Sequence, residues 1–326
     1  MKTSWFHQTL TLIIGLLVSL TIAEAQGWPN KTITIVVPYE AGGGHDAMAR
    51  ILAEGLTEKL GQSVIVVNKT GASGMIGAEF VTRAAPDGYT ILFASPSETV
   101  NAKIVYKKMR YDPEKNLEPV TLAGTSPLVF VASPSNDIKT LGDLIAQAKS
   151  NPGLISFGTA GSVGTTRLTV ELLKKIANIE MTHIPYKGAA LATNDVLAGQ
   201  ISIAIVGMSP VMSHIRSGKL VPLAITQRSR LTWAKDIPAA SETPGLQGFE
   251  AVNWMGVFLP SKTPTNVLDH LQREIVAVLR EPDRRNRLIA MGIDPVGNTP
   301  SEFKTFLVAD RERFLKMFQA SGLKPE

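Results

Sequence analysis

The 326-residue chain contains no cysteine. A disulfide framework, a thiolate metal site and a cysteine nucleophile are therefore all excluded. The fold must be stabilised by burial alone. A chain of roughly 300 residues can achieve this, because it buries about 75% of its unfolded surface and commonly divides into two domains. We expect two lobes.

Aromatic residues are also scarce, at 6% of the chain, and the lysines and arginines are scattered among acids. A nucleic-acid-binding protein would show a basic stripe with interleaved aromatic side chains. We therefore expect no nucleic-acid partner. The net charge of +5 is a mild attractor for anions and does not identify one.

Long apolar runs are missing after the first 25 residues, since no later window offers the about 18 uninterrupted apolar residues of a transmembrane helix. The N-terminus itself has Lys2, an apolar stretch at residues 10–22 and the small-residue motif AEA at residues 23–25. This is the layout of a secretory signal peptide. We expect residues 1–25 to be removed on export and the mature protein to be soluble in the periplasm.

Strand and helix patterns alternate along the rest of the chain. The segments "KTITIVVPY", "SVIVVN" and "YTILFAS" are rich in β-branched and apolar residues, and helical spacing of apolar residues follows the first of them as far as Gly61. A second unit of the same kind starts near Thr121 with a long extended segment, and helices are expected there at residues 137–150 and 165–177. The pattern predicts an α/β fold with mainly parallel strands.

The C-terminal part contains the strand "MGVFLP" and helices expected at residues 265–280 and 301–320. It has too few strands for a third domain, so we expect it to return to the first lobe through a two-segment hinge. The predicted first lobe comprises residues 26–125 and 227–326, and the second comprises residues 126–226. The point of return, near Thr226 or near Trp254, stays open at this stage.

Three joints between strand and helix are rich in glycine and small hydroxyl residues: "EAGGGHD" at 40–46, "NKTGASGMIG" at 68–77 and "GTAGSVGTT" at 158–166. Glycine lets the backbone approach a ligand closely, and a helix start leaves N–H groups without intrahelical partners. These groups carry partial positive charge and suit an anion. Tight turns alone would also explain any one of these loops, but the set of three fits a ligand cleft between two lobes better.

Catalytic and cofactor motifs are weak by comparison. The chain has no G-x-x-x-x-G-K-[ST] loop and no G-x-G-x-x-G pattern, so no nucleotide cofactor is expected. Ser73 and Ser162 lie in glycine-rich turns, but neither has glycines at both flanking positions of a G-x-S-x-G elbow. The histidines occur singly, without the spacing of a metal site. A hydrolase or isomerase using Ser162 or His183 remains an alternative, although it needs a nucleophile and base within hydrogen-bond reach.

Four stretches together resemble a known family. "VVPYEAGGGHDAMARILAEGL", "VVNKTGASGMIGAEFVTRAAPDGYTILFAS", "FGTAGSVGTTRLTVELL" and "THIPYKGAALATNDVLAGQI" are similar to the substrate-binding proteins of tripartite tricarboxylate transporters, the Bordetella uptake gene family. The resemblance covers essentially the whole mature chain. It implies a monomeric two-lobed periplasmic binding protein of type II that holds a small organic carboxylate without a cofactor and delivers it to membrane permease subunits. A periplasmic sensor subunit that binds the same ligand is an alternative.

The resemblance also implies which residues contact the ligand, because the family holds a carboxylate largely with backbone amides from the first loop and further contacts from the second lobe. Carried over residue by residue, the ligand-binding set is Tyr39, Ala41, Gly42, Gly43, Asp46, Ser73, Ser95, Ser97, Ala160, Gly161, Ser162, Thr165, Thr166, Arg167, Asp195 and Met208. Asp46 is more simply a residue that complements the dipole of its helix or caps its N–H groups.

The sequence departs from the family pattern at two places. Arg167 stands where the family often has histidine, and it could hold a second carboxylate bidentately or point to solvent. Ser202 replaces an aspartate in "GQIS", which puts any family role of that acid in doubt.

Other conspicuous residues have ordinary interpretations. We expect Trp254 in core or interlobe packing, Lys187 in solvent, and "REPDRRNR" on an exposed helical face.

Overall fold

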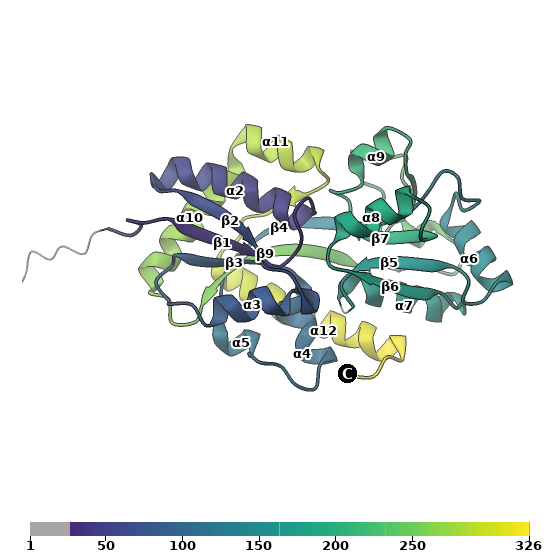
Figure 1. Ribbon diagram of the computed structural model, residues 1–326, viewed down its shortest axis with the longest axis horizontal. Helices are drawn as coiled ribbons and strands as arrows, with labels where there is room; N and C mark the ends of the chain where they lie inside the picture. Colours follow the sequence, from purple (N-terminus) through teal and green to yellow (C-terminus); the bar gives the residue numbers. More distant parts are fainter. Residues whose placement is uncertain (1–26, 163, 232, 326) are drawn as a thin grey trace, which may run out of the picture.

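The computed structural model describes residues 27–162, 164–231 and 233–325. Two α/β lobes lie side by side and share one curled sheet (Figure 1). The signal peptide predicted at residues 1–25 lies outside the described residues. In the described part of the chain, no helix is both long and apolar enough to span a membrane.

The first lobe is built on three parallel strands. The order is β2-β1-β3, and Ile35 of the central strand pairs with Val66 on one side and Ile91 on the other. Apolar side chains cover both faces of this sheet in two core clusters. The elements are β1 (Ile33–Val37), α2 (Gly44–Leu60), β2 (Val64–Asn68), η1 (Ala72–Gly74), α3 (Met75–Thr82), β3 (Thr90–Ala94), η2 (Ser97–Asn101), α4 (Ala102–Val105) and α5 (Pro113–Asn116).

The second lobe repeats this plan with the parallel strands β6-β5-β7. It too has an apolar cluster on each face of its sheet. Its elements are α6 (Leu141–Ser150), β5 (Ser156–Ala160), α7 (Thr165–Ala177), β6 (Thr182–Tyr186), α8 (Ala189–Leu197), β7 (Ile203–Gly207), α9 (Met212–Arg216), β8 (Val221–Ile225) and η3 (Ala240–Glu242). The helix predicted at 165–177 is confirmed.

Two strands cross between the lobes, namely β4 (Leu117–Ala132) and β9 (Val252–Pro260) (Figure 1). The first part of β4 pairs with β9 as far as Pro127, and from Leu128 onward it pairs with β7 and β8. All these pairings are antiparallel, as is that of β9 with β3. The expectation of mainly parallel strands is therefore wrong at the junction, because the chain enters the second lobe on one strand and comes back on a neighbouring strand that runs the other way.

The segment between β8 and β9, expected in the first lobe, packs on the core of the second. Ala240, Leu246 and Phe249 are buried beside Phe130 and Leu223. We propose that the chain returns to the first lobe at β9, the later of the two points that the sequence leaves open.

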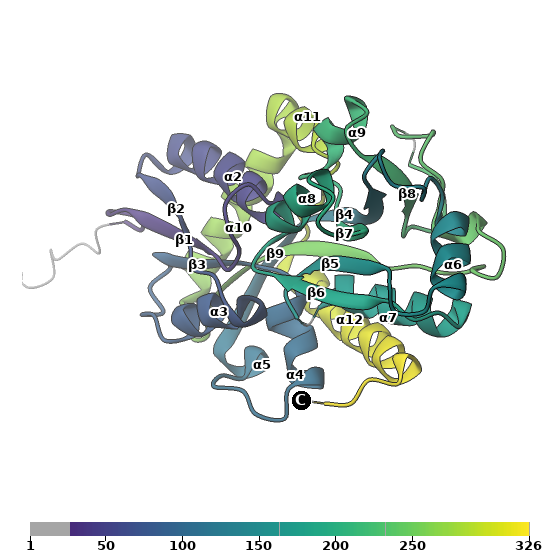
Figure 2. The same ribbon diagram turned by 45° about the vertical axis from the view of Figure 1, so that its right-hand side comes forward.

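The last part of the chain is helical and covers more than the first lobe. Its elements are α10 (Thr265–Arg280), α11 (Pro282–Ala290), β10 (Asp294–Pro295) and α12 (Pro300–Ser321). Phe303 at the start of α12 packs in the first lobe beside Trp254, as expected, whereas Phe314 and Phe318 pack against Leu168 of α7. Figure 2 shows α12 running from beside α4 of the first lobe to a position next to α7 of the second. This helix therefore links the lobes as a third element beside β4 and β9.

The stretch "REPDRRNR" runs from the last residue of α10 into α11, and the prediction that it is exposed is wrong for Arg284. Only 10% of the Arg284 side chain is exposed, and its guanidinium lies 2.6 Å from Glu58 of α2, with Glu281 as a further partner. The acids of α2 thus hold α11 to the first lobe, because a buried cation must be paired.

Candidate ligand-binding cleft

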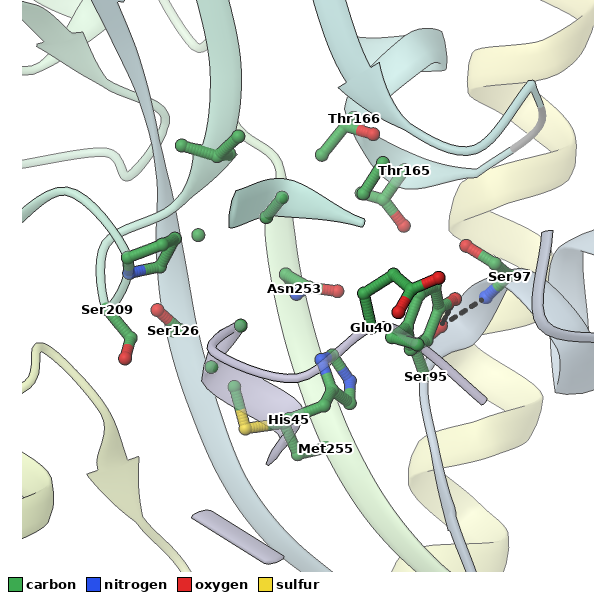
Figure 3. A pocket seen from close by; sticks show the side chains of 18 residues that line it. Glu40, His45, Ser95, Ser97, Ser126, Thr165, Thr166, Ser209, Asn253 and Met255 are labelled. Carbon is green, nitrogen blue, oxygen red and sulfur yellow. Dashed lines mark hydrogen bonds between the residues drawn. The ribbon is translucent and has the colours of Figure 1, made fainter. Parts of the chain in front are cut away.

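A cleft of about 640 Å³, counted to its open mouth, lies where the lobes meet. Both lobes contribute to its wall, and hydroxyl groups dominate the polar part (Figure 3). The lining residues are Tyr39, Glu40, Gly43, Gly44, His45, Ser95, Ser97, Ser126, Ala160, Thr165, Thr166, Ala189, Val206, Gly207, Ser209, Pro210, Asn253 and Met255.

Three helices of the described chain begin at this cleft: α2 of the first lobe, and α7 and α8 of the second. Their N-cap residues are Gly43, Gly164 and Gly188. Glycine has no side chain that could accept a hydrogen bond from the amides of the first turn, so the N-cap residue leaves these N–H groups without a partner. The cleft thereby gathers partial positive charge from both lobes, which favours a negatively charged ligand.

The sequence predicted two of these three helix starts. The third, at Gly188 in "YKGAAL", was missed, although it too is a glycine between a strand and a helix. The remaining predicted loop, 68–77, does not line the cleft. It contacts the other lobe instead, since Ser73 Oγ lies 3.3 Å from Ser162 Oγ and accepts the Ser162 N–H at 3.2 Å. These two serines therefore join the lobes beside the cleft.

Hydroxyl groups from the first lobe form one side of the cleft. Tyr39 follows β1, whereas Ser95 and Ser97 follow β3, so all three lie at the carboxyl ends of parallel strands, as predicted. Ser97 N–H donates to Ser95 Oγ at 3.0 Å (Figure 3). Beneath them lies Glu98, which sequence reasoning missed. Burial raises the pKa of this carboxyl group to about 7, against hydrogen bonds from Ser95 and Tyr39 that lower it.

The crossing strands supply further polar groups that the sequence did not reveal. Ser126 lies on β4 and Asn253 on β9, and Ser209 follows β7. Long β-strands carry no local signal of which face meets a ligand, so only the packing of the two lobes identifies these residues. His45 also lines the cleft, and its Nε2 is buried without a hydrogen-bond partner among the described residues. Burial lowers its pKa to about 4, so the imidazole is neutral at pH 7.

Asp46 supports the first loop rather than lining the cleft. Its Oδ2 accepts the Gly42 N–H at 3.1 Å and Arg50 Nε at 3.0 Å, and its Oδ1 accepts Asn68 Nδ2 at 3.0 Å. Burial opposes ionisation of Asp46, but these three hydrogen bonds outweigh it and hold its pKa below the usual value. Gly42 precedes the N-cap of α2, so Asp46 braces the loop and does not cap an N–H group of the helix. Its bond to Gly42 fixes the loop that carries Gly43.

Several other predicted site residues lie away from the cleft wall. Ala41 and Gly42 are exposed on the outer part of the first loop. Gly161 donates its N–H to the Tyr186 carbonyl at 2.7 Å, and Asp195 accepts the Tyr186 hydroxyl at 2.6 Å. Met208 is fully buried in the core of the second lobe. None of these residues, nor Asp46, Ser73, Ser162 and Arg167, is among the residues that line the described cleft.

Arg167 takes neither of the two positions considered for it. Its Nη1 donates to the Ser162 carbonyl at 2.7 Å, and only 22% of the side chain is exposed. It therefore holds the loop that ends β5. Ser202, at the other departure, exchanges hydrogen bonds with Ser156 on the neighbouring strand. Lys187 is exposed, as expected.

The groups proposed for hydrolysis are engaged elsewhere. His183 Nε2 lies 2.7 Å from Thr159 Oγ1, and that hydroxyl gives its hydrogen to the Gly161 carbonyl at 2.7 Å. The histidine must therefore donate, which fixes the Nε2–H tautomer. Burial, together with the nearby positive charges of Arg167 and Lys174, lowers the pKa of His183 to about 4. Within the described residues, no group of three or more histidine, aspartate or glutamate side chains could hold a metal ion.

The two lobes touch closely around the cleft. A Cβ placed on Gly164 would lie 2.4 Å from Ser97 Oγ of the first lobe, and one on Gly44 would lie 3.2 Å from Ser209 Cβ of the second. Asn101 Nδ2 also donates to Thr165 Oγ1 at 3.3 Å. The lobes are thus in direct contact beside the cleft, and glycine allows their backbones to approach.

Comparison with known proteins identifies the family. Residues 48–323 match the sequence pattern of the Tripartite tricarboxylate transporter family receptor. The chain belongs to this family. Protein BugT of Bordetella pertussis, a relative, is 33% identical over 302 residues, which are 92% of each chain. Two solved structures share the family fold. Rpa4515 of R. palustris with adipate has a TM-score of 0.89 at 30% identity, covering 92% of this chain and 100% of that one. MatC of Rhodopseudomonas palustris with bound malate has a TM-score of 0.84 at 27% identity, covering 89% and 99%.

Proposed function

We propose that the protein captures a small organic carboxylate between its lobes in the periplasm and delivers it, as a monomer, to the permease subunits of a tripartite tricarboxylate transporter. The observation that carries this proposal is the convergence of three glycine-capped helix starts from both lobes on one cleft. Rpa4515 with adipate and MatC with malate support a carboxylate as the ligand class. The layout of residues 1–25 supports export.

The energies suffice for useful affinity. A micromolar dissociation constant corresponds to about −8.2 kcal/mol. Hydrogen bonds to a charged group contribute about 1.5–3 kcal/mol each, so three or four amide and hydroxyl donors provide most of this. The hydroxyls of Ser97, Thr165 and Thr166 face the cleft from its two sides (Figure 3). Because only the closed form brings both sides to one ligand, binding shifts the population toward closure.

A panel of organic acids, each paired with its neutral amide, tests the proposal. Adipate and malate are the first acids to examine, and adipamide is the matched control for adipate. An acid at about 100 times its dissociation constant stabilises the protein by about 2.7 kcal/mol, which we expect to raise the melting temperature by about 5 °C. The amide should give no shift, because it lacks the charge that the helix starts attract. Equal stabilisation by acid and amide, or a ligand recovered chemically changed, contradicts the proposal.

A further inference from the structure

Glu98 is a buried carboxyl group directly under the cleft. It is fully buried in η2, and one of its oxygens, Oε1, accepts the Ser95 N–H at 2.6 Å. Gly74 of η1 closes over it, since a Cβ there would lie 2.9 Å from Oε2. The carboxyl group forms no ion pair with any cation among the described residues, although buried acids are normally paired when ionised.

Its second oxygen completes a triangle of short contacts. Ser95 Oγ lies 2.7 Å from Glu98 Oε2, Tyr39 Oη lies 2.9 Å from the same atom, and the two hydroxyl oxygens lie 2.7 Å apart. Each contact needs one hydrogen between its oxygens. Tyr39 and Ser95 carry one hydroxyl hydrogen each, and an ionised carboxylate carries none. With only two hydrogens, one of the three contacts has no hydrogen, and the lone pairs of its two oxygens face each other. The triangle is therefore complete only when Glu98 is protonated.

The proton count decides what the cleft can offer an anion. If Glu98 is ionised, it takes the hydrogens of both Tyr39 and Ser95 and places a negative charge beneath the site. If Glu98 is protonated, its own hydrogen fills the third contact, so the triangle is complete and the negative charge beneath the site is removed. Since Tyr39 and Ser95 both line the cleft, the charge of an ionised Glu98 would lie directly behind its wall.

We propose that Glu98 is a positioning residue of the cleft that carries a proton when a carboxylate is bound, so that binding takes up about one proton from neutral solution. The inference rests on the proposed function, because it describes how that site accepts its anion. Ser95 and Tyr39 hold the carboxyl group in the triangle, and Glu98 acts on the ligand through its charge rather than by direct contact.

The surroundings of Glu98 are consistent with a proton that titrates near neutrality, since burial raises its pKa to about 7. Burial also raises the pKa of Tyr39 and of Tyr111, so both stay protonated. His45 is neutral at pH 7, and Glu79 is paired with Arg83 at 2.6 Å. The elements packed against η2 carry further charged groups, which include Glu79 of α3, Lys103 of α4, Glu114 of α5 and Asp310 of α12. Lys103 is paired with Asp112 and Glu114.

The test compares wild type with Glu98→Gln, whose amide keeps the shape of the protonated acid and does not titrate. Adipate and malate serve as probes in calorimetric titrations at pH of about 6 to 9, in buffers of different ionisation enthalpy. For wild type we expect uptake of about one proton above pH 7, and affinity that falls about tenfold per pH unit there. For Glu98→Gln we expect no proton uptake and affinity constant within about twofold. Glu79→Gln, the same change on the adjacent helix α3, should behave as wild type.

Infrared difference spectra of the ligand-free proteins add a readout that needs no ligand. Wild type and Glu79→Gln should show the stretch of a protonated carboxyl group at pH of about 6, and Glu98→Gln should lack it. A wild-type protein without this band, or one that binds acid without proton uptake, overturns the inference alone. Failure of both acids to bind overturns the proposed function and the proton linkage together, whereas the infrared band still reports the protonation of Glu98.

Discussion

Replacing Gly164 with alanine should weaken carboxylate binding about 10- to 100-fold while leaving each lobe folded. Gly164 belongs to the second lobe, and a Cβ on it would lie 2.4 Å from Ser97 Oγ of the first. We expect this collision to disappear when the two lobes move apart. Overpacking of this kind costs about 1–3 kcal/mol. This cost reduces the free energy of ligand binding, because the lobes must come together around the ligand despite the collision. Isothermal titration with the best acid of the panel measures the effect.

The control separates the collision from backbone strain. Gly164 has a φ of 146°, a conformation that alanine adopts at a cost. Gly153 has a positive φ as well, 80°, but a Cβ on it would meet no atom within 4 Å. Gly153→Ala should therefore lose some stability and keep full affinity. Small-angle scattering should show a larger radius for Gly164→Ala at saturating acid than for wild type. If Gly164→Ala binds and closes like wild type, lobe closure does not create the site.

Replacing Trp254 with alanine should lower the free energy of unfolding by about 3–5 kcal/mol. The side chain is fully buried among Phe258, Phe303 and Phe306, with ring centroids 5.7–6.3 Å apart. Its Nε1–H donates to Asp310 at 2.8 Å. It thus joins the crossing strand β9 to helix α12, and its neighbours along β9 line the cleft. Urea unfolding of the mature chain measures the loss.

Two variants separate packing from the hydrogen bond. Trp254→Phe keeps most of the ring contacts but removes the donor, so we expect a smaller loss of about 1–3 kcal/mol from the buried acceptor. Burial already raises the pKa of Asp310, with Arg313 and Trp254 opposing the rise, so removing the indole should raise it further. Trp233→Ala, at a half-buried position in the second lobe, should cost less than Trp254→Ala. Equal losses at both positions would contradict a central role for Trp254.

The sequence predicted most of the fold because its signals are local. β-branched runs, helical spacing and terminal glycines define β1, α2 and α7, and Gly61 ends α2 in the left-handed conformation. The antiparallel crossing of β4 and β9 was not predicted, because strand direction depends on which distant segments pair. The path of α12 across both lobes was not predicted for the same reason. Phe314 and Phe318 indicate that the helix has an apolar face, but the sequence does not indicate which distant segment that face packs against.

The site was predicted in part for a related reason. Glycine-rich joints are visible in sequence, so Gly43, Thr165 and Thr166 were found at the cleft. Asn253 and Ser126 lie on long strands, where nothing local distinguishes the face that meets a ligand. Glu98 was missed because its burial depends on Gly74 and on the packing of η2. Its only sequence signal is its place as an acid in the first helical turn after β3. An acid at such a place is usually explained by its favourable interaction with the helix dipole.

The central claim is that backbone amides at helix starts of both lobes hold a carboxylate. The most direct measurement is an amide ¹H–¹⁵N titration of the mature protein with the acid that the panel identifies. The account predicts that the largest shifts occur at Gly43, Gly44, Thr165, Thr166 and Ala189. A bound acid that moves these amides no more than that of the remote Gly218 would contradict it.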